Sequence, residues 1–206
     1  MMKHDVRLLV VLLFGVLFDA GTLSAQMNKP DLSLQVSGGL YSPLSDDIQN
    51  IYSTGAVGQV SIAASMGLQS RLKVTGNLFR KSGNPYISIN DFSAGDAGKL
   101  SLNSVGMLLE IGGRGAHNPQ VWLGAGLLYF WGSEAIDGLG KNRGDGLGAM
   151  FSLSPEFQIS RKLFLITEAS LRLVDIKFRD GNQRYTFNLS GATLSLGLGY
   201  QFIHKD

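Results

Sequence analysis

Apolar and small polar residues alternate through most of the chain, and this pattern constrains the fold more than any other feature. In the segment 32–41, leucine and valine occupy most of one set of alternate positions, and serine and glutamine occupy much of the other. Successive side chains of a β-strand point to opposite faces, so a period of two predicts a strand. Eight segments show this pattern: 32–41, 60–68, 72–78, 105–111, 121–131, 147–158, 165–173 and 192–202.

The polar face of these segments is built mainly from Ser, Gly, Thr and Gln, which suit a narrow interior better than a surface in water. The apolar face carries no Lys or Arg, either of which costs about 2–4 kcal/mol at the midplane of a bilayer. A strand of about ten residues tilted by roughly 45° covers roughly 23 Å, close to the ~25 Å apolar band of an outer-membrane barrel. We therefore predict an all-β fold, an eight-stranded antiparallel up-and-down transmembrane β-barrel. The alternative is a soluble β-sandwich or lipocalin-like barrel.

Composition narrows the class of protein further. Glycine accounts for 27 of the 206 residues, and charged residues make up 17%, below the roughly 25% of an average soluble domain. The formal net charge of +2 is not the basic excess of a nucleic-acid-binding protein. The sequence has no cysteine, which excludes disulfides and thiolate metal sites.

The first 25 residues have the features of a secretory signal peptide. Basic residues precede an apolar run at 8–18, which is too short to cross a bilayer as a helix. Small residues before position 26 offer a cleavage site. We expect cleavage near Ala25, which leaves 26–206 as one exported β-barrel domain. The alternative is an N-terminal anchor that is not cleaved.

The connections between the expected strands alternate in length. Long or moderate connections are expected at 42–55, 81–99, 132–146 and 179–186, tight turns at 70–72 and 160–162, and an intermediate one at 112–119. Outer-membrane barrels have short periplasmic turns and longer outer loops, so both chain ends are expected in the periplasm.

Local pairing is also predicted at the two tight turns and in the first long connection. Gln69 is expected to pair with Lys73, and Ile159 with Leu163. Ser45 resembles a helix N-cap, with acidic residues after it, so a short helix is expected to follow as far as Tyr52. This segment either folds over the barrel mouth as a helix or is an ordinary loop that packs on itself.

The end of the chain carries a polar residue, a glycine two positions later, and aromatic residues three and five positions after that glycine. These residues are Ser195, Gly197, Tyr200 and Phe202. They resemble the C-terminal β-signal that the barrel assembly machinery reads, although four residues follow Phe202. The chain as a whole resembles the small eight-stranded barrels of Gram-negative outer membranes, such as the OmpA membrane domain and OmpX-like proteins of the porin family. The resemblance implies an outer-membrane location, contact with outer-membrane lipid and insertion by the assembly machinery.

Charged residues occupy inward positions on several expected strands. They are Lys73, Glu110, Glu156, Glu168 and Arg172, with Arg80 as a further candidate. Charges inside a membrane need partners, so these residues are expected to form a charge network in the half of the lumen nearer the periplasm. Such a network either forms a solvated, structural interior or acts as a gate for a narrow pore.

Catalysis has little support in the sequence. Enzymes on outer-membrane barrels need a histidine beside a serine or a carboxylate near the bilayer surface. His117 is expected in a turn and His204 in the C-terminal tail, and the glycine-rich segment 138–144 lacks phosphate-loop spacing. We therefore expect no enzyme, no cofactor and no metal.

Four basic residues are expected on outer loops, where lipid phosphates come within reach. They are Lys141, Arg143, Arg179 and Arg184, and nearby aspartates dilute their charge. Ordinary solvated charge is the alternative interpretation.

Three functions remain open for a barrel of this size. An eight-stranded barrel is only wide enough for its own side chains, which argues against a general porin. The first hypothesis is a non-enzymatic outer-membrane barrel with a structural or surface-interaction role through its outer loops. The second is a narrow OmpW-like conduit for small or hydrophobic solutes, favoured by glycines at wall positions 124, 126, 148, 197 and 199. The third is a PorT-like accessory component of a secretion system, with an unidentified partner.

Overall fold

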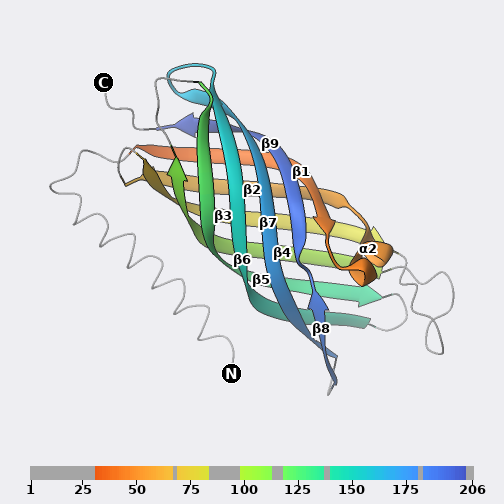
Figure 1. Ribbon diagram of the computed structural model, residues 1–206. Helices are drawn as coiled ribbons and strands as arrows, with labels where there is room; N and C mark the ends of the chain where they lie inside the picture. The colour runs from red at the N-terminus through yellow and green to blue at the C-terminus, as the bar shows by residue number, and fades with distance from the viewer. Residues whose placement is uncertain are drawn as a thin grey trace.

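The computed structural model is a cylinder of tilted antiparallel strands with a short helix at one end (Figure 1). It describes residues 31–66, 69–83, 98–112, 118–136, 140–180 and 183–202, so the expected signal peptide lies outside the described residues. The strands are β1 (Leu32–Pro43), β2 (Gly55–Ser65), β3 (Ser70–Gly83), β4 (Gly98–Gly112), β5 (Gln120–Ile136), β6 (Gly140–Gln158), β7 (Leu163–Asp180), β8 (Gln183–Asn188) and β9 (Gly191–Gln201). The helix is α2 (Asp46–Tyr52). No helix in the described part of the chain is long and apolar enough to cross a membrane.

The sheet closes into an eight-stranded barrel. Strands that follow one another in sequence pair from β1 to β7, and β9 pairs with both β7 and β1. Strands β8 and β9 pair with β7 in one continuous register, interrupted only at 189–190, so together they make the eighth wall strand. The predicted eight-stranded antiparallel barrel is therefore confirmed.

The two faces of the wall are arranged as the alternation predicts. On β1, Gln35 points inward and is 4% exposed, whereas Val36 points outward and is 53% exposed. Leu194 on β9 is 67% exposed. A water-soluble barrel has polar residues outside and apolar residues inside. This barrel has the reverse distribution, which is typical of a transmembrane barrel.

The barrel has two distinct ends. The helix and the strand ends at Gly83, Gly98, Ile136, Gly140, Asp180 and Gln183 lie at one end, which we call the outer end. The strand ends at Ser65 and Ser70 and the turn 159–162 lie at the opposite end, which we call the inner end.

The prediction of a tight turn at 70–72, at the inner end of β2 and β3, was wrong. Lys73 pairs with Ala63 and not with Gln69, so Arg71 belongs to β3 and points into the barrel. The other predicted turn is confirmed, since the Ile159 N–H donates to the Leu163 carbonyl oxygen at 2.9 Å.

Two of the predicted long loops are largely strand. β5 and β6 remain paired as far as Ile136 and Gly140, so the expected loop 132–146 shortens to 137–139. β7 and β8 likewise leave only 181–182 between them. Strands of an outer-membrane barrel continue beyond the bilayer, and there their outward residues are polar because they face water. Such residues look like loop residues in the sequence.

The predicted short helix is present and it folds over the barrel mouth. Its first turn is closed by the Gln49 N–H, which donates to the Ser45 carbonyl oxygen at 2.8 Å. Ile48 and Tyr52 point into the barrel and are 2% and 0% exposed. They join a buried cluster that fills the outer half of the lumen: Tyr41, Val57, Phe79, Leu100, Leu102, Leu108, Leu128, Phe130, Met150, Val174, Ile176, Phe178 and Leu189. The outer half of the lumen is therefore mainly apolar, and most of the small polar interior expected from the sequence lies in the inner half.

Candidate functional site

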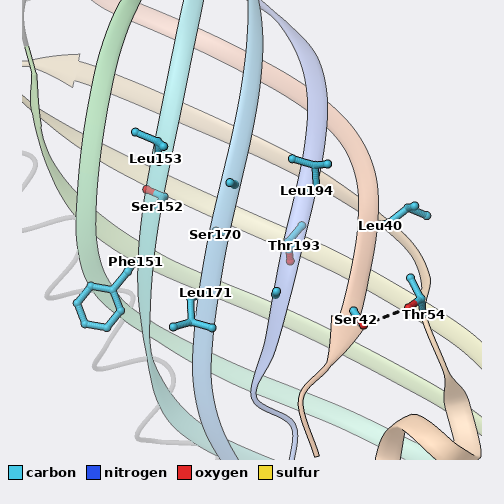
Figure 2. Close-up of a pocket in the computed structure, with 12 residues that line it drawn as sticks. Leu40, Ser42, Thr54, Phe151, Ser152, Leu153, Ser170, Leu171, Thr193 and Leu194 are labelled. Atoms are coloured by element: carbon cyan, nitrogen blue, oxygen red, sulfur yellow. Dashed lines mark hydrogen bonds between the residues drawn. The ribbon is translucent and has the colours of Figure 1, made fainter.

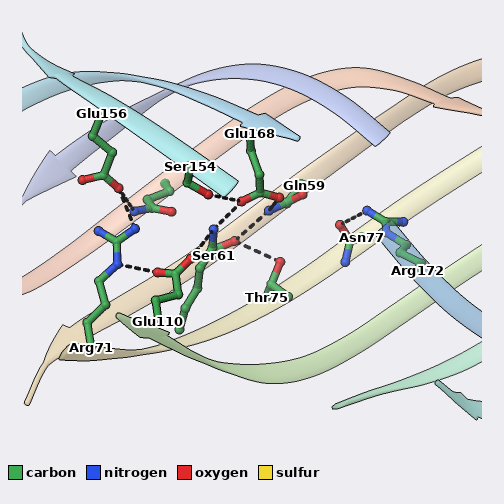
Figure 3. Close-up of polar contacts among 12 residues, drawn as sticks. Gln59, Ser61, Arg71, Thr75, Asn77, Glu110, Ser154, Glu156, Glu168 and Arg172 are labelled. Atoms are coloured by element: carbon green, nitrogen blue, oxygen red, sulfur yellow. Dashed lines mark hydrogen bonds and ion pairs between the residues drawn. The ribbon is translucent and has the colours of Figure 1, made fainter. Parts of the chain in front are cut away.

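The inner half of the lumen holds a chain of buried ion pairs (Figure 3). Arg71 lies between two carboxylates: its Nε contacts Glu110, and its Nη2 lies 2.7 Å from Glu156 Oε1. Lys73 continues the chain, with its Nζ 3.4 Å from Glu110 Oε1 and in contact with Glu168 Oε2. The result is an alternating series of three carboxylates and two cations that joins β3 and β4 to β6 and β7 across the lumen.

Neutral side chains donate hydrogen bonds to the two carboxylates at the ends of this series, Glu156 and Glu168. Gln35 Nε2 donates to Glu156 Oε1 at 3.1 Å, and Gln59 Nε2 donates to Glu168 Oε1 at 3.1 Å. The Ser154 hydroxyl donates to Glu168 Oε2 at 3.2 Å. Breaking a buried ion pair by removing one partner costs about 3–5 kcal/mol, so this network holds opposite walls of the barrel together.

Arg172 is buried in the lumen but lies apart from the ion-pair chain. Its Nη2 donates to Asn77 Oδ1 at 2.8 Å, and its guanidinium lies 5.8 Å from the centre of the Tyr41 ring. Among the described residues it has no carboxylate within ion-pair distance. The structure therefore brings Lys73, Glu110, Glu156 and Glu168 together and leaves Arg172 separate, while Arg80 is exposed on the outside of β3.

Arg71 is the member of the network that sequence reasoning missed. Its signal was its position two residues before Lys73, because residues i and i+2 of a strand share a face. Its guanidinium also lies 4.2 Å from the centre of the Trp122 ring, a favourable cation–π distance. Together these two side chains line a polar hollow of about 170 Å³ at the inner end of the lumen.

The outer half of the lumen is closed by aromatic packing. Phe178 stacks on Tyr185 with ring centres 5.6 Å apart, and Phe187 lies against both rings. Tyr185 and Phe187 come from β8, so this strand covers the apolar cluster from the side on which β1 has already ended.

A buried carboxylate joins the helix to this aromatic group. Glu134 on β5 is 4% exposed. It accepts a hydrogen bond of 2.6 Å from the Tyr52 hydroxyl of α2 and one of 3.2 Å from the Tyr185 hydroxyl of β8. Burial, together with the hydrogen bond to Glu134, raises the pKa of Tyr52 well above its ordinary value. We call Tyr52, Glu134 and Tyr185 the latch.

The outside of the wall has a shallow hollow of about 640 Å³ over β6, β7, β9 and β1 (Figure 2). Outward side chains such as Leu40, Leu153 and Leu194 border it, and a hydrogen bond of 3.1 Å from Thr54 to Ser42 marks its outer rim. Apart from Thr54, the residues that line it belong to these four wall strands.

The four residues that resemble the β-signal lie on β9 or directly after it. Tyr200 and Phe202 point outward, with ring centres 5.1 Å apart, and Ser195 points inward. Gly197 faces β1 so closely that an added Cβ would lie 2.3 Å from the Val36 carbonyl oxygen. Recognition of these residues by the assembly machinery stays a prediction.

Within the described ranges, no group of three or more His, Cys, Asp or Glu side chains is arranged to hold a metal ion. His117 and His204 lie outside those ranges.

Comparison with known proteins supports the fold and not a sequence family. No protein-family model matches the chain, and no curated protein matches its sequence. Among solved structures it is similar to OprG of Pseudomonas aeruginosa, with a TM-score of 0.68, 11% identity, and coverage of 85% of this chain and 97% of that one.

Two further structures show the same architecture. The outer membrane protein W of E. coli has a TM-score of 0.54 at 10% identity, over 86% of this chain and all (100%) of its own. Ail, the attachment invasion locus protein of Yersinia pestis, has a TM-score of 0.52 at 11% identity, over 85% and 100%. The chain therefore has the fold of the small eight-stranded outer-membrane β-barrels.

Proposed function

We propose that this protein is a non-enzymatic and non-conducting outer-membrane β-barrel, with a structural or surface-interaction role that it exercises through its outer end. The observation that carries the proposal is that the lumen is filled at two levels. The ion-pair chain crosses the inner half, and the apolar cluster with α2 fills the outer half. A barrel closed in this way has only its outside and its two ends available for interaction.

The wall glycines do not favour the alternative of an OmpW-like conduit. An added Cβ on Gly124 would lie 2.4 Å from the Ser152 hydroxyl, and one on Gly199 would lie 2.2 Å from the Phe164 ring. Neighbouring atoms already occupy the space beside these glycines, so the glycines allow close packing and do not widen the lumen.

A surface role has a precedent on this fold, since the name of Ail, the attachment invasion locus protein, indicates attachment. This precedent is an analogy of fold, and folds of this kind host several functions. Within this chain, α2 and the outer ends of β5, β6, β7 and β8 offer the surface at the outer end.

Electrical recording in planar bilayers tests the closed lumen. Wild-type protein that shows the heat-dependent gel shift of a folded barrel is expected to give no steady unitary openings, with a general porin as the positive control. Reproducible openings of one size would overturn the proposal and favour a conduit.

Labelling of intact cells tests which end faces outward. The sequence has no cysteine, so a single introduced cysteine is a unique target for a membrane-impermeant maleimide. The Lys141→Cys variant, at the outer end, is expected to react on intact cells. The Ser160→Cys variant, at the inner end, is expected to react only after lysis, and the reverse pattern would refute a surface role for the outer end.

A further inference from the structure

Three arginines stand side by side across the outer ends of three neighbouring strands. Arg143 on β6 is the cross-strand partner of Arg179 on β7, and Arg179 is in turn the partner of Arg184 on β8. The side chains of Arg143 and Arg179 are exposed. We call these three positions the arginine row.

The row extends along its strands with further positive charge. Lys141 lies two residues from Arg143 on the same face of β6, and Lys177 lies two residues from Arg179 on the same face of β7. Both side chains are exposed. The acidic neighbours on this face, Asp145 and Asp175, lie closer to the membrane than the row itself.

The arrangement is unfavourable for the protein alone. Like charges directly opposite each other on neighbouring strands destabilise a sheet. Among the described residues, no carboxylate lies within ion-pair distance of Arg143 or Arg179. Positive charge collected in one row and left without acidic partners is suited to an anionic ligand.

The depth of the row indicates where this ligand lies. Leu147 on β6 is 70% exposed and lipid-facing. Beside it on β5, Tyr129 and Trp131 stack with ring centres 6.1 Å apart, as aromatic residues do at the membrane interface. Arg143 is four residues beyond Leu147, which on a tilted strand is about 9 Å along the membrane normal. That height falls within the headgroup layer.

We propose that the arginine row binds the phosphate groups of lipids in the outer leaflet of the outer membrane. Guanidinium groups pair with phosphate oxygens through two parallel hydrogen bonds. The guanidinium groups of Arg143 and Arg179 would engage a phosphorylated headgroup while the acyl chains lie against the leucines below. The bound phosphate would also relieve the repulsion within the row.

The test uses residues 26–206, which leave out the expected signal peptide, folded into phosphatidylcholine vesicles with and without lipid A. Lipid A is expected to raise the thermal midpoint of unfolding of the wild type, measured by the gel shift. Arg143→Gln/Arg179→Gln is expected to lose most of that rise and to bind lipid A about tenfold or more weakly.

The matched control removes the same charge elsewhere at the outer end. Arg80→Gln/Lys99→Gln changes two exposed cations on β3 and β4, and it is expected to keep the full lipid A effect. An equal loss in both variants, or no loss in the row variant, would refute a site at the row. Inorganic phosphate added to vesicles without lipid A is expected to give no shift, and an equal shift with phosphate would refute a lipid ligand.

Discussion

Lys73 on β3 contacts Glu168 on β7 across the lumen, and this contact joins two strands whose residues are 95 positions apart in the sequence. The side chains are 1% and 2% exposed. Neither charge has access to water, so each depends on the other and on Glu110, Gln59 and Ser154 for its stability.

Replacing Lys73 is therefore expected to be severe. Lys73→Met leaves Glu168 buried without its cation, and we expect it to lower the free energy of unfolding by about 3–5 kcal/mol. Urea unfolding in detergent micelles measures this loss. Arg80→Met, which removes an exposed cation from the outside of the same strand, serves as the control and should change stability little. A similar stability for both variants would show that the ion pair contributes nothing.

The two buried arginines are expected to differ in importance. Arg71 pairs with Glu110 and Glu156 and lies on Trp122, whereas Arg172 bonds only to Asn77 among the described side chains. Arg71→Met should therefore lower the thermal midpoint in detergent clearly more than Arg172→Met. An equal or larger effect of Arg172→Met would mean that the ion-pair chain does not hold the walls together.

The sequence was sufficient to predict the strands and their lipid-facing sides, because alternation is a local property that a single strand displays. The sequence was not sufficient to predict which residues form the charge network. The prediction placed Arg71 in a tight turn between β2 and β3, so it missed the cation that joins Glu110 to Glu156. Register depends on turn geometry and on pairing with a second strand, and the local pattern located the turn at 160–162 correctly but misplaced the one between β2 and β3.

The filled outer half was also beyond local patterns. Phe130 on β5 and Phe178 on β7 point into the barrel, whereas the residues before and after each of them point outward to lipid or water. The sequence shows that they alternate, but only the closed barrel brings them against α2 and β8. The sequence pattern placed Tyr52 on a short helix near the barrel mouth, but its contact with Glu134, and that of Tyr185 with Glu134, exist only in the folded barrel.

The latch is expected to hold α2 on the barrel. Tyr52→Phe removes a buried hydrogen bond to a carboxylate, and such bonds contribute about 1.5–3 kcal/mol. We expect a loss of that size at neutral pH. A double-mutant cycle with Glu134→Gln separates the interaction from other effects, and a coupling energy near zero would exclude the latch.

The latch also predicts sensitivity to alkali. The pKa of Tyr52 is raised in the folded protein, so its neutral hydroxyl stabilises the fold fully below the ordinary tyrosine pKa of about 10. At higher pH the unfolded chain releases this proton while the folded chain retains it, so the stabilisation is lost as pH rises towards the raised value. Stability measured across alkaline pH should fall more steeply for the wild type than for Tyr52→Phe. If stability fell equally steeply with pH in the two proteins, the result would contradict the raised pKa of Tyr52.

The outward aromatic residue at the end of the chain allows assembly to be separated from stability. Phe202 is 51% exposed, so Phe202→Ser should refold in detergent almost as well as the wild type. If Phe202 belongs to a β-signal, the same variant should accumulate poorly in the outer membrane of cells. Normal accumulation in cells would show that this residue is not part of a signal.

Gly197 is expected to be required for closure of the barrel itself. A side chain there would meet the backbone of β1, with its Cβ 2.3 Å from the Val36 carbonyl oxygen and 2.4 Å from Ser37 Cβ. Because β1 and β9 are the strands that close the sheet, Gly197→Val should abolish the heat-dependent gel shift even when the protein is refolded in detergent without assembly machinery. Gly58→Val is the matched control, since an added Cβ at this outward position of β2 meets no atom within 4 Å. If Gly197→Val refolded in detergent and failed only in cells, the glycine would act as a recognition element and not through close packing against β1.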